Sequence, residues 1–420
     1  MKMSRFPAWS WSASLVAAAV LIAVVTSWQI IGFLGLPLSK DEYNLGVWEV
    51  RHFPDKWLHM VGHLGGDSSR DQDNAEVVRY LQLQQKVDAL QAQLNQQTAT
   101  NAPEEEQRAT ARLLDSTRNE RDSIENHVQS ILEGRISGVA SSLGIETTFP
   151  LFSRVHWLFP PVDFEFEDPP HLLVISPRDR IVQEQATLLR SDLSLEEAQR
   201  LESHAEAKSN NVSALVVPTG GIGAYPAIIE PTDDYVSALQ VASHEWMHDY
   251  LYFHPLGARY FVSDDLRTIN ETVADIVGME MGSLVAATYP IASPTPAPSP
   301  TGQATPDSVN VDQVLRQLRL QVDSLLAQGK VTDAESLMEE TRQYLADHGH
   351  YIRKINQAFF AFYGLYGTTG ASSSPIGPKL EELRQKSASL GDFIRAVQGV
   401  KSEADLDRLL AAAGATPTPP

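Results

Sequence analysis

The sequence predicts an α+β fold that is mostly helical, with a small sheet, preceded by a transmembrane helix and a helical-hairpin stalk. Three observations support this prediction. A long apolar run lies near the N-terminus, two coiled-coil-like patterns follow it, and two short apolar runs suited to strands then stand among amphipathic helical segments.

Composition narrows the class of protein. The 420-residue chain has 43% hydrophobic and 20% charged residues, a balance typical of folded proteins. Its formal net charge of −20 argues against a nucleic-acid partner, because phosphate binding requires clustered lysine and arginine. The chain has no cysteine, which excludes disulfides, thiolate metal sites and a cysteine nucleophile.

The N-terminal apolar run is long enough to cross a bilayer. No side chain between residues 6 and 39 is charged, and Leu15 to Leu36 contains only three polar residues. At 1.5 Å per residue, about 20 such residues span a hydrocarbon core of roughly 30 Å. A cleaved signal peptide is the alternative, but its apolar region is shorter, about 7–15 residues, and ends at a small-residue cleavage site. We therefore expect residues 1–40 to form a cytoplasmic tip and an uncleaved transmembrane anchor.

The positive charges flanking the span are nearly balanced, since Lys40 and Arg51 follow it, so the expected orientation depends on the form of the N-terminus. Lys2 and Arg5 make a very short basic N-terminus ahead of a long apolar run, the pattern of a signal-anchor. We expect a single-pass cell-membrane protein with a cytoplasmic N-terminus and its bulk outside the cytoplasm.

A juxtamembrane segment at residues 41–74 leads into a predicted helical hairpin at residues 75–142. The first helix has an apolar seam with alternating three- and four-residue spacing, formed by Tyr80, Leu83, Val87, Leu90 and Leu94. A polar turn at 95–103 separates it from a second helix of similar pattern. The hairpin could be a stalk, a partner surface, a self-association element through residues 75–135, or simply a solvated arm.

The remaining chain divides at a proline-rich segment. Residues 143–289 are expected to form a central core, residues 290–308 a Pro/Thr/Ser-rich linker, residues 309–410 a C-terminal helical part, and residues 411–420 a disordered tail. Strands are expected at 171–176 and 214–218, and helices at 194–209, 236–253, 268–287, 311–327, 332–347, 351–366 and, as one helix or a pair, 378–397.

The strongest chemical signal is the H-E-x-x-H motif formed by His244, Glu245 and His248. Residues four apart lie on one helix face, so both imidazoles can bind one ion. Catalytic zinc takes three protein ligands and a water. Glu245 would lie beside that water and accept its proton. We therefore predict His244 and His248 as zinc ligands and Glu245 as the general base.

A second motif supplies the missing ligand. Asn270, Glu271 and Asp275 form N-E-x-x-x-D, which begins 22 residues after His248. A zinc site with two histidines needs a third ligand, often a carboxylate, and a metal-bound histidine usually donates its other N–H to an acceptor. Glu271 suits the ligand role and Asp275 the acceptor role.

Together the two motifs resemble those of the gluzincin zinc metallopeptidases, the thermolysin-like and aminopeptidase group. The resemblance covers roughly residues 214–285, about a sixth of the chain. In these families the position after the second histidine is usually uncharged, whereas here it is Asp249. The resemblance implies peptide-bond hydrolysis and assigns the zinc ligands His244, His248 and Glu271, the base Glu245, Asp275 beside one ligand histidine and Asn270 near the other.

The same resemblance suggests where substrate binds. Gluzincins place an extended edge strand before the metal-binding helix, and its backbone pairs with bound peptide. A glycine-rich segment stands in the matching place here, with an ordinary loop as the alternative. The substrate-strand candidates are Gly221, Gly223, Ala224 and Tyr225.

These enzymes also stabilise the oxyanion of the tetrahedral intermediate with a tyrosine or histidine that usually lies C-terminal to the third ligand. The candidates here are His348, His350, Tyr351, Tyr363 and Tyr366.

The sequence as a whole therefore predicts a membrane-anchored zinc metallopeptidase acting on a peptide or protein substrate, with aminopeptidase and endopeptidase action both open. The alternative is a membrane-anchored scaffold or interaction protein with a structural or vestigial zinc site. Every residue that catalysis requires is present, which favours the enzyme.

Overall fold

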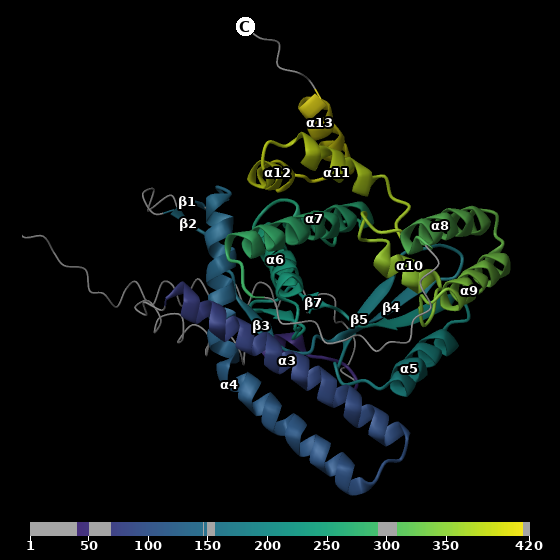
Figure 1. The fold of residues 1–420 in the computed structure, drawn as a ribbon. Coiled ribbons are helices and arrows are strands. Elements are labelled where there is room, and N and C mark those ends of the chain that lie inside the picture. Colours follow the sequence, from purple (N-terminus) through teal and green to yellow (C-terminus); the bar gives the residue numbers. More distant parts are fainter. Residues whose placement is uncertain (1–39, 50–68, 146, 149–155, 293–308, 415–420) are drawn as a thin grey trace, which may run out of the picture.

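The computed structural model describes residues 40–49, 69–145, 147–148, 156–292 and 309–414 (Figure 1). The transmembrane span expected at 15–36 lies outside these ranges, and so does the proline-rich linker expected at 290–308 except for its first three residues. Within them, no helix is both long enough and apolar enough to cross a membrane.

The described fold is mostly helical α+β, as the sequence predicts, with two small three-stranded sheets. The first sheet has the order β5-β4-β6 and is antiparallel, with β4 (His171–Pro177) between β5 (Gln185–Leu189) and β6 (Val212–Val217). Strands β4 and β6 confirm the two expected strands, whereas β5 was not anticipated. Helix α5 (Leu195–Lys208) begins at a capping box between Ser194 and Glu197, close to its expected bounds.

The second sheet has the order β3-β8-β7. Strand β8 (Ala227–Ile229) is central. Strand β3 (Phe164–Phe166) runs parallel to it on one side, and β7 (Gly221–Ile222) pairs antiparallel with it on the other. A short antiparallel pair, β1 (Thr147–Thr148) and β2 (His156–Trp157), stands apart from both sheets.

Two packed helices lie at the centre of the molecule (Figure 1). Helix α6 (Tyr235–Tyr252) begins where the Asp234 side chain accepts hydrogen bonds from two backbone amides. Helix α7 (Asp264–Thr288) begins four residues before the expected start, because Ser263 caps it and two acidic residues occupy its first turn. A short 3-10 helix, Gly257–Arg259, lies between them.

The C-terminal half is helical. Helices α8 (Val311–Ala327), α9 (Val331–Asp347) and α10 (Gln357–Tyr363) share a core with β4 and β6. The helix expected at 351–366 is shorter, because the Asn356 side chain caps α10 and starts it late. Helices α11 (Ile376–Lys386), α12 (Leu390–Val397) and α13 (Glu403–Gly414) pack against the α7 side of the main core.

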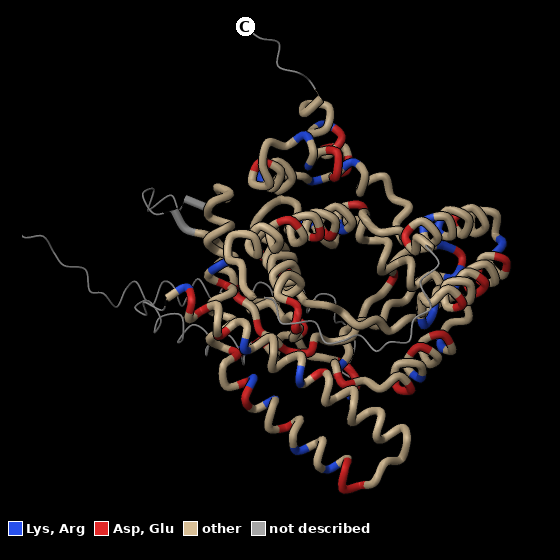
Figure 2. The backbone as a smooth tube through the Cα atoms, viewed as in Figure 1, with Lys and Arg blue, Asp and Glu red and all other residues tan. Residues whose placement is uncertain are grey.

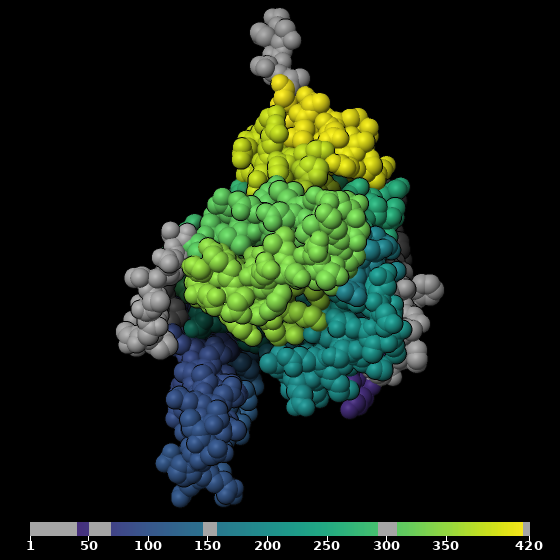
Figure 3. Space-filling view, turned by 90° about the vertical axis from the view of Figure 1, so that its right-hand side faces the viewer, coloured from purple at the N-terminus to yellow at the C-terminus, as the bar shows by residue number. Residues whose placement is uncertain are grey.

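Helices α3 (Arg70–Ala99) and α4 (Glu104–Ser142) form the predicted antiparallel hairpin, which projects from the rounded body (Figures 1 and 3). Four of the five expected seam residues, Tyr80, Leu83, Val87 and Leu90, are buried, and Leu94 is half-buried against Val87 and Leu90. Along both helices, lysine and arginine alternate with acidic residues (Figure 2).

Candidate metal centre

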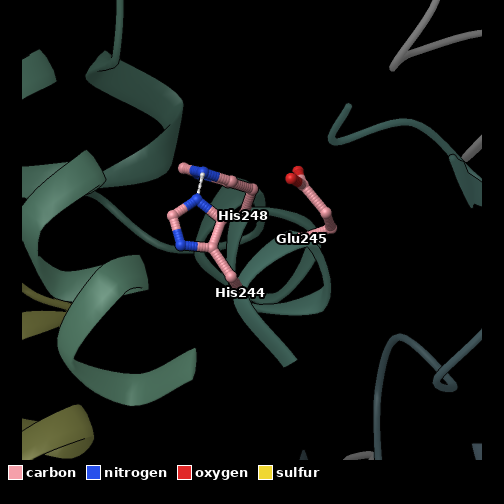
Figure 4. A group of neighbouring side chains, drawn as sticks. All are labelled: His244, Glu245 and His248. Carbon is pink, nitrogen blue, oxygen red and sulfur yellow. Dashed lines mark hydrogen bonds between the residues drawn. The ribbon is translucent and has the colours of Figure 1, made fainter. Parts of the chain in front are cut away.

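The two histidines of H-E-x-x-H face one another on α6. One helical turn separates them, and their Nε2 atoms lie 3.2 Å apart (Figure 4). His244, Glu245 and His248 form a group whose ligand atoms all lie within 4.8 Å of one another. Such a group can hold a metal ion.

Helix α7 brings Glu271 to the same place. The Glu271 Oε2 atom lies 3.5 Å from His248 Nε2 and 3.9 Å from His244 Nε2. This approach depends on two glycines of α7. A Cβ atom on Gly278 would lie 2.8 Å from His244 Cβ, and one on Gly282 would lie 2.6 Å from Gln240 Cα. Because neither glycine has a side chain, the two helix backbones pack closely enough for Glu271 to reach the histidines.

These spacings fit one tetrahedral ion. Two ligand atoms at about 2.0–2.1 Å from a zinc ion lie roughly 3.3–3.4 Å apart. The separations of 3.2, 3.5 and 3.9 Å among the two imidazole nitrogens and the carboxylate oxygen bracket that value. Imidazole with carboxylate is also a donor set that zinc and neighbouring transition metals accept.

Burial governs the protonation of the group. It lowers the pKa of His244 to about 3, with His248 acting in the same direction, so this ring is neutral. Burial also raises the pKa of Glu245 to about 7, which suits a general base.

The other two groups are coupled. Burial opposes the charge on Glu271, but His248 beside it prevails and lowers the pKa to about 2. Burial likewise disfavours a charged His248, but the attraction of Glu271 outweighs this effect and raises the pKa of His248 to about 9. Metal binding at His248 Nε2 therefore requires loss of a proton.

The acceptors around the two histidines differ from those expected, which were Asp275 beside one and Asn270 near the other. His248 Nδ1 lies 2.8 Å from Asn270 Oδ1, so Asn270 contacts one histidine of H-E-x-x-H directly. Asp275 accepts a hydrogen bond of 2.6 Å from the Thr368 hydroxyl. Tyr260, which the sequence did not single out, donates its hydroxyl to Glu271 Oε1.

A cavity of about 680 Å³ opens onto these groups. Two of the four substrate-strand candidates line it, namely Gly221 and Gly223. A Cβ atom on Gly221 would clash with the Glu245 carboxylate, and one on Gly223 would lie 3.2 Å from His248 Cβ. Ala224 and Tyr225 are instead fully buried in the protein interior. Because Gly221 and Gly223 have no side chains, β7 and the residue after it can lie directly against Glu245 and His248.

The structure separates the oxyanion candidates. Tyr363 and Tyr366 line the cavity, and the Tyr366 ring centroid lies 6.3 Å from that of His244. Tyr351 is 77% exposed. His348 stacks on Tyr344, and neither it nor His350 is among the described residues that line the cavity. Tyr366 is thus the candidate nearest to the metal-binding group.

Comparison with protein-family models, with curated proteins and with solved structures found no match.

Asp249, at the position where the resemblance is broken, is 6% exposed and also lines the cavity. Burial raises its pKa well above the usual range, which favours the neutral carboxyl. A neutral Asp249 adds no charge beside His248.

Sequence reasoning missed three features of this site. Gly278 and Gly282 carried a readable signal, since small residues four apart mark the face of a helix that another helix approaches closely. Tyr260 and Arg267 carried none, because an isolated tyrosine or arginine between two motifs is usually a surface or core residue. Both line the cavity.

Proposed function

We propose that the chain is a zinc metallopeptidase of the gluzincin type, anchored in a membrane by its N-terminal segment. One observation carries the proposal: two histidine nitrogens and a carboxylate oxygen lie at the spacings of a single ion, beside a buried glutamate, on a substrate-sized cavity. A pocket of this size is in the range that binds small ligands or a few peptide residues.

In this mechanism His244, His248 and Glu271 would hold the zinc, which would supply a bound water of lowered pKa. Glu245 accepts the proton of the attacking water and passes it to the leaving amine. Its raised pKa suits both steps, because the carboxylate must take up a proton and then release it. Tyr366 donates its hydroxyl to the oxyanion of the tetrahedral intermediate.

Strand β7 holds the substrate. It is one of the two outer strands of its sheet, so one edge of its backbone can pair with an extended peptide. Gly221 and Gly223 allow that backbone to lie close to Glu245 and His248. Binding through main-chain groups favours peptides or loosely folded segments as substrates.

The cellular setting rests on the sequence. The apolar run from Leu15 to Leu36 anchors the chain, and Lys2 and Arg5 favour a cytoplasmic N-terminus. The catalytic domain then lies outside the cytoplasm.

Replacing Glu245 by Gln tests the proposal. The variant removes the base but no metal ligand, so it is expected to retain stoichiometric zinc and to lose about 100-fold or more of its peptidase activity. Zinc is measured by mass spectrometry of the purified protein, and activity by digestion of a peptide library.

Glu340→Gln is the matched control, because Glu340 is exposed on α9. It is expected to behave as wild type. Near-wild-type cleavage by Glu245→Gln would show that another group is the base. A wild-type protein that binds no zinc would overturn the metal assignment.

A further inference from the structure

Arg267 lies in the first turn of α7, one helical turn before Glu271. Residues four apart share a helix face, so Arg267 points to the same side of α7 as the third metal ligand. Both side chains line the cavity. The turn separates them by about 6 Å along the helix axis, roughly two residues of an extended peptide.

The Arg267 guanidinium is buried with unused donors. The residue is 9% exposed, and its Nε and Nη1 atoms are buried without a hydrogen-bond partner among the described residues. Its Nη1 atom lies 3.7 Å from Asp264 Oδ1, beyond hydrogen-bond length, and the Asp264 side chain is 57% exposed. The guanidinium also lies over the Tyr260 ring, 5.8 Å from the centroid. Buried donors nearly always find an acceptor, so these two indicate a missing partner.

Arg267 stands out among the charged groups of the cavity. Of the described residues that line it, Arg267 is the only lysine or arginine, while four carry a carboxyl group, namely Glu245, Asp249, Glu271 and Asp275. Away from the metal position, an anionic group that enters the cavity therefore meets Arg267 as its cationic partner.

We propose that Arg267 binds a carboxylate of the substrate, within about two residues of the bond that is cut. This inference rests on the proposed peptidase function. A guanidinium presents two pairs of parallel N–H donors, Nε with Nη2 and Nη1 with Nη2, and either pair matches the two oxygens of a carboxylate. The carboxylate is either the free C-terminus of the peptide or the side chain of an acidic residue.

The test compares binding of four dansylated pentapeptides to the zinc-loaded Glu245→Gln protein, by fluorescence anisotropy. One pair is dansyl-Ala-Ala-Phe-Leu-Ala as the free acid and as the C-terminal amide. The second pair consists of amides that end in Glu or Gln in place of the last Ala. A preference within the first pair identifies the C-terminus, and one within the second pair identifies a side chain.

We expect the carboxylate peptide of one pair to bind about 10- to 100-fold more tightly than its neutral twin, the effect of one charge-assisted pair. Adding Arg267→Met should abolish that preference, and Arg267→Lys should retain part of it. Arg108→Met on the exposed face of the hairpin is the control and should change nothing.

If the protein that retains Arg267 binds both members of each pair equally, the proposal is overturned. No variant at that position is needed for this result. Arg267 could instead have a purely structural role and only support Tyr260 and Glu271. In that case Arg267→Met would lower the binding of all four peptides alike. Binding and cleavage are separate measurements, so a carboxylate preference that depends on Arg267, in a protein whose wild type cleaves no peptide, would support this site and count against the proposed mechanism alone.

Discussion

The hydrogen bond between His248 and Asn270 determines which ring nitrogen of that histidine faces the metal position. Asn270 Oδ1 can only accept, so His248 Nδ1 carries the proton and Nε2 is left to face Glu271 and His244. The neighbouring Asp275 is held instead by Thr368. The two acceptors of the second motif therefore have different roles.

This difference predicts different effects on zinc affinity. Asn270→Ala is expected to weaken zinc binding about 10–100-fold, the usual loss when the partner of a ligand histidine is removed. Asp275→Ala should weaken it less, because its carboxylate is bound to a hydroxyl. Competition with a zinc chelator measures both. An equal loss in the two variants would show that Asp275 pairs with His244 when zinc is bound.

Gly223 offers a test of the substrate strand. Its φ is not positive, so a bulky residue meets no backbone strain there. Its Cβ would nevertheless lie 3.2 Å from His248 Cβ, on the floor of the cavity. Gly223→Val is expected to raise KM about tenfold or abolish turnover while zinc and melting temperature remain close to wild type.

Gly399→Val is the control for that experiment, since a Cβ at Gly399 meets no atom within 4 Å and the residue is exposed. If Gly223→Val had an unchanged kcat/KM and unchanged stability, β7 would not bind substrate.

At the scale of elements, the packing of α7 on α6 places Glu271, the proposed third ligand, beside the two histidines. A methyl group on Gly278 would lie 2.8 Å from His244 Cβ and 2.9 Å from Gln240 O. Neither contact can be relieved by a flexible side-chain end, so the helices must separate. Glu271 moves with α7.

Gly278→Ala is therefore expected to destabilise the protein by about 1–3 kcal/mol, as overpacking does, and to weaken zinc binding. Gly134→Ala on α4 is the control. It has open space at Cβ and lies in an exposed helix position, so it should stabilise by about 0.5–1 kcal/mol. Urea unfolding measures both. A stable Gly278→Ala protein with normal zinc affinity would show that the glycine is not needed for close approach.

At the scale of the whole molecule, the hairpin has two parts. At its base, Tyr80 stacks on Phe166 with ring centroids 5.0 Å apart and belongs to the main core together with Ile136. At its tip, Val87, Leu90 and Leu114 form a separate small cluster. The base is thus integral to the folded body, while the tip packs only on itself.

Removing Val87 to Arg118 and joining the helices by a short Gly-Asn-Gly-Ser turn is expected to preserve zinc content and peptidase activity. The cut joins the helices near the pair formed by Gln84 and Arg121, where they face each other. Loss of any dimer, measured by light scattering, would assign self-association to the tip. Tyr80→Ala in the base should instead cost about 3–5 kcal/mol, and a severe loss of stability on removing the tip would contradict this division.

The sequence by itself determined the features that depend on neighbours a few residues away. H-E-x-x-H on one face of α6, Glu271 on α7, the capped start of α5 and the seam of the hairpin all follow from helical periodicity and local hydrogen bonds. These features depend on spacings of three and four residues, so they can be recognised before the fold is known.

Only the tertiary structure decided which distant residues complete the site. Tyr366 rather than Tyr351 lies beside His244, and Arg267 enters the cavity with its donors unused. The pattern of apolar residues in the sequence also did not predict strand β5 or the late start of α10. The physical reason is the same in each case: such contacts depend on how helices and strands pack across the core, and packing follows from the shapes of side chains far apart in the chain.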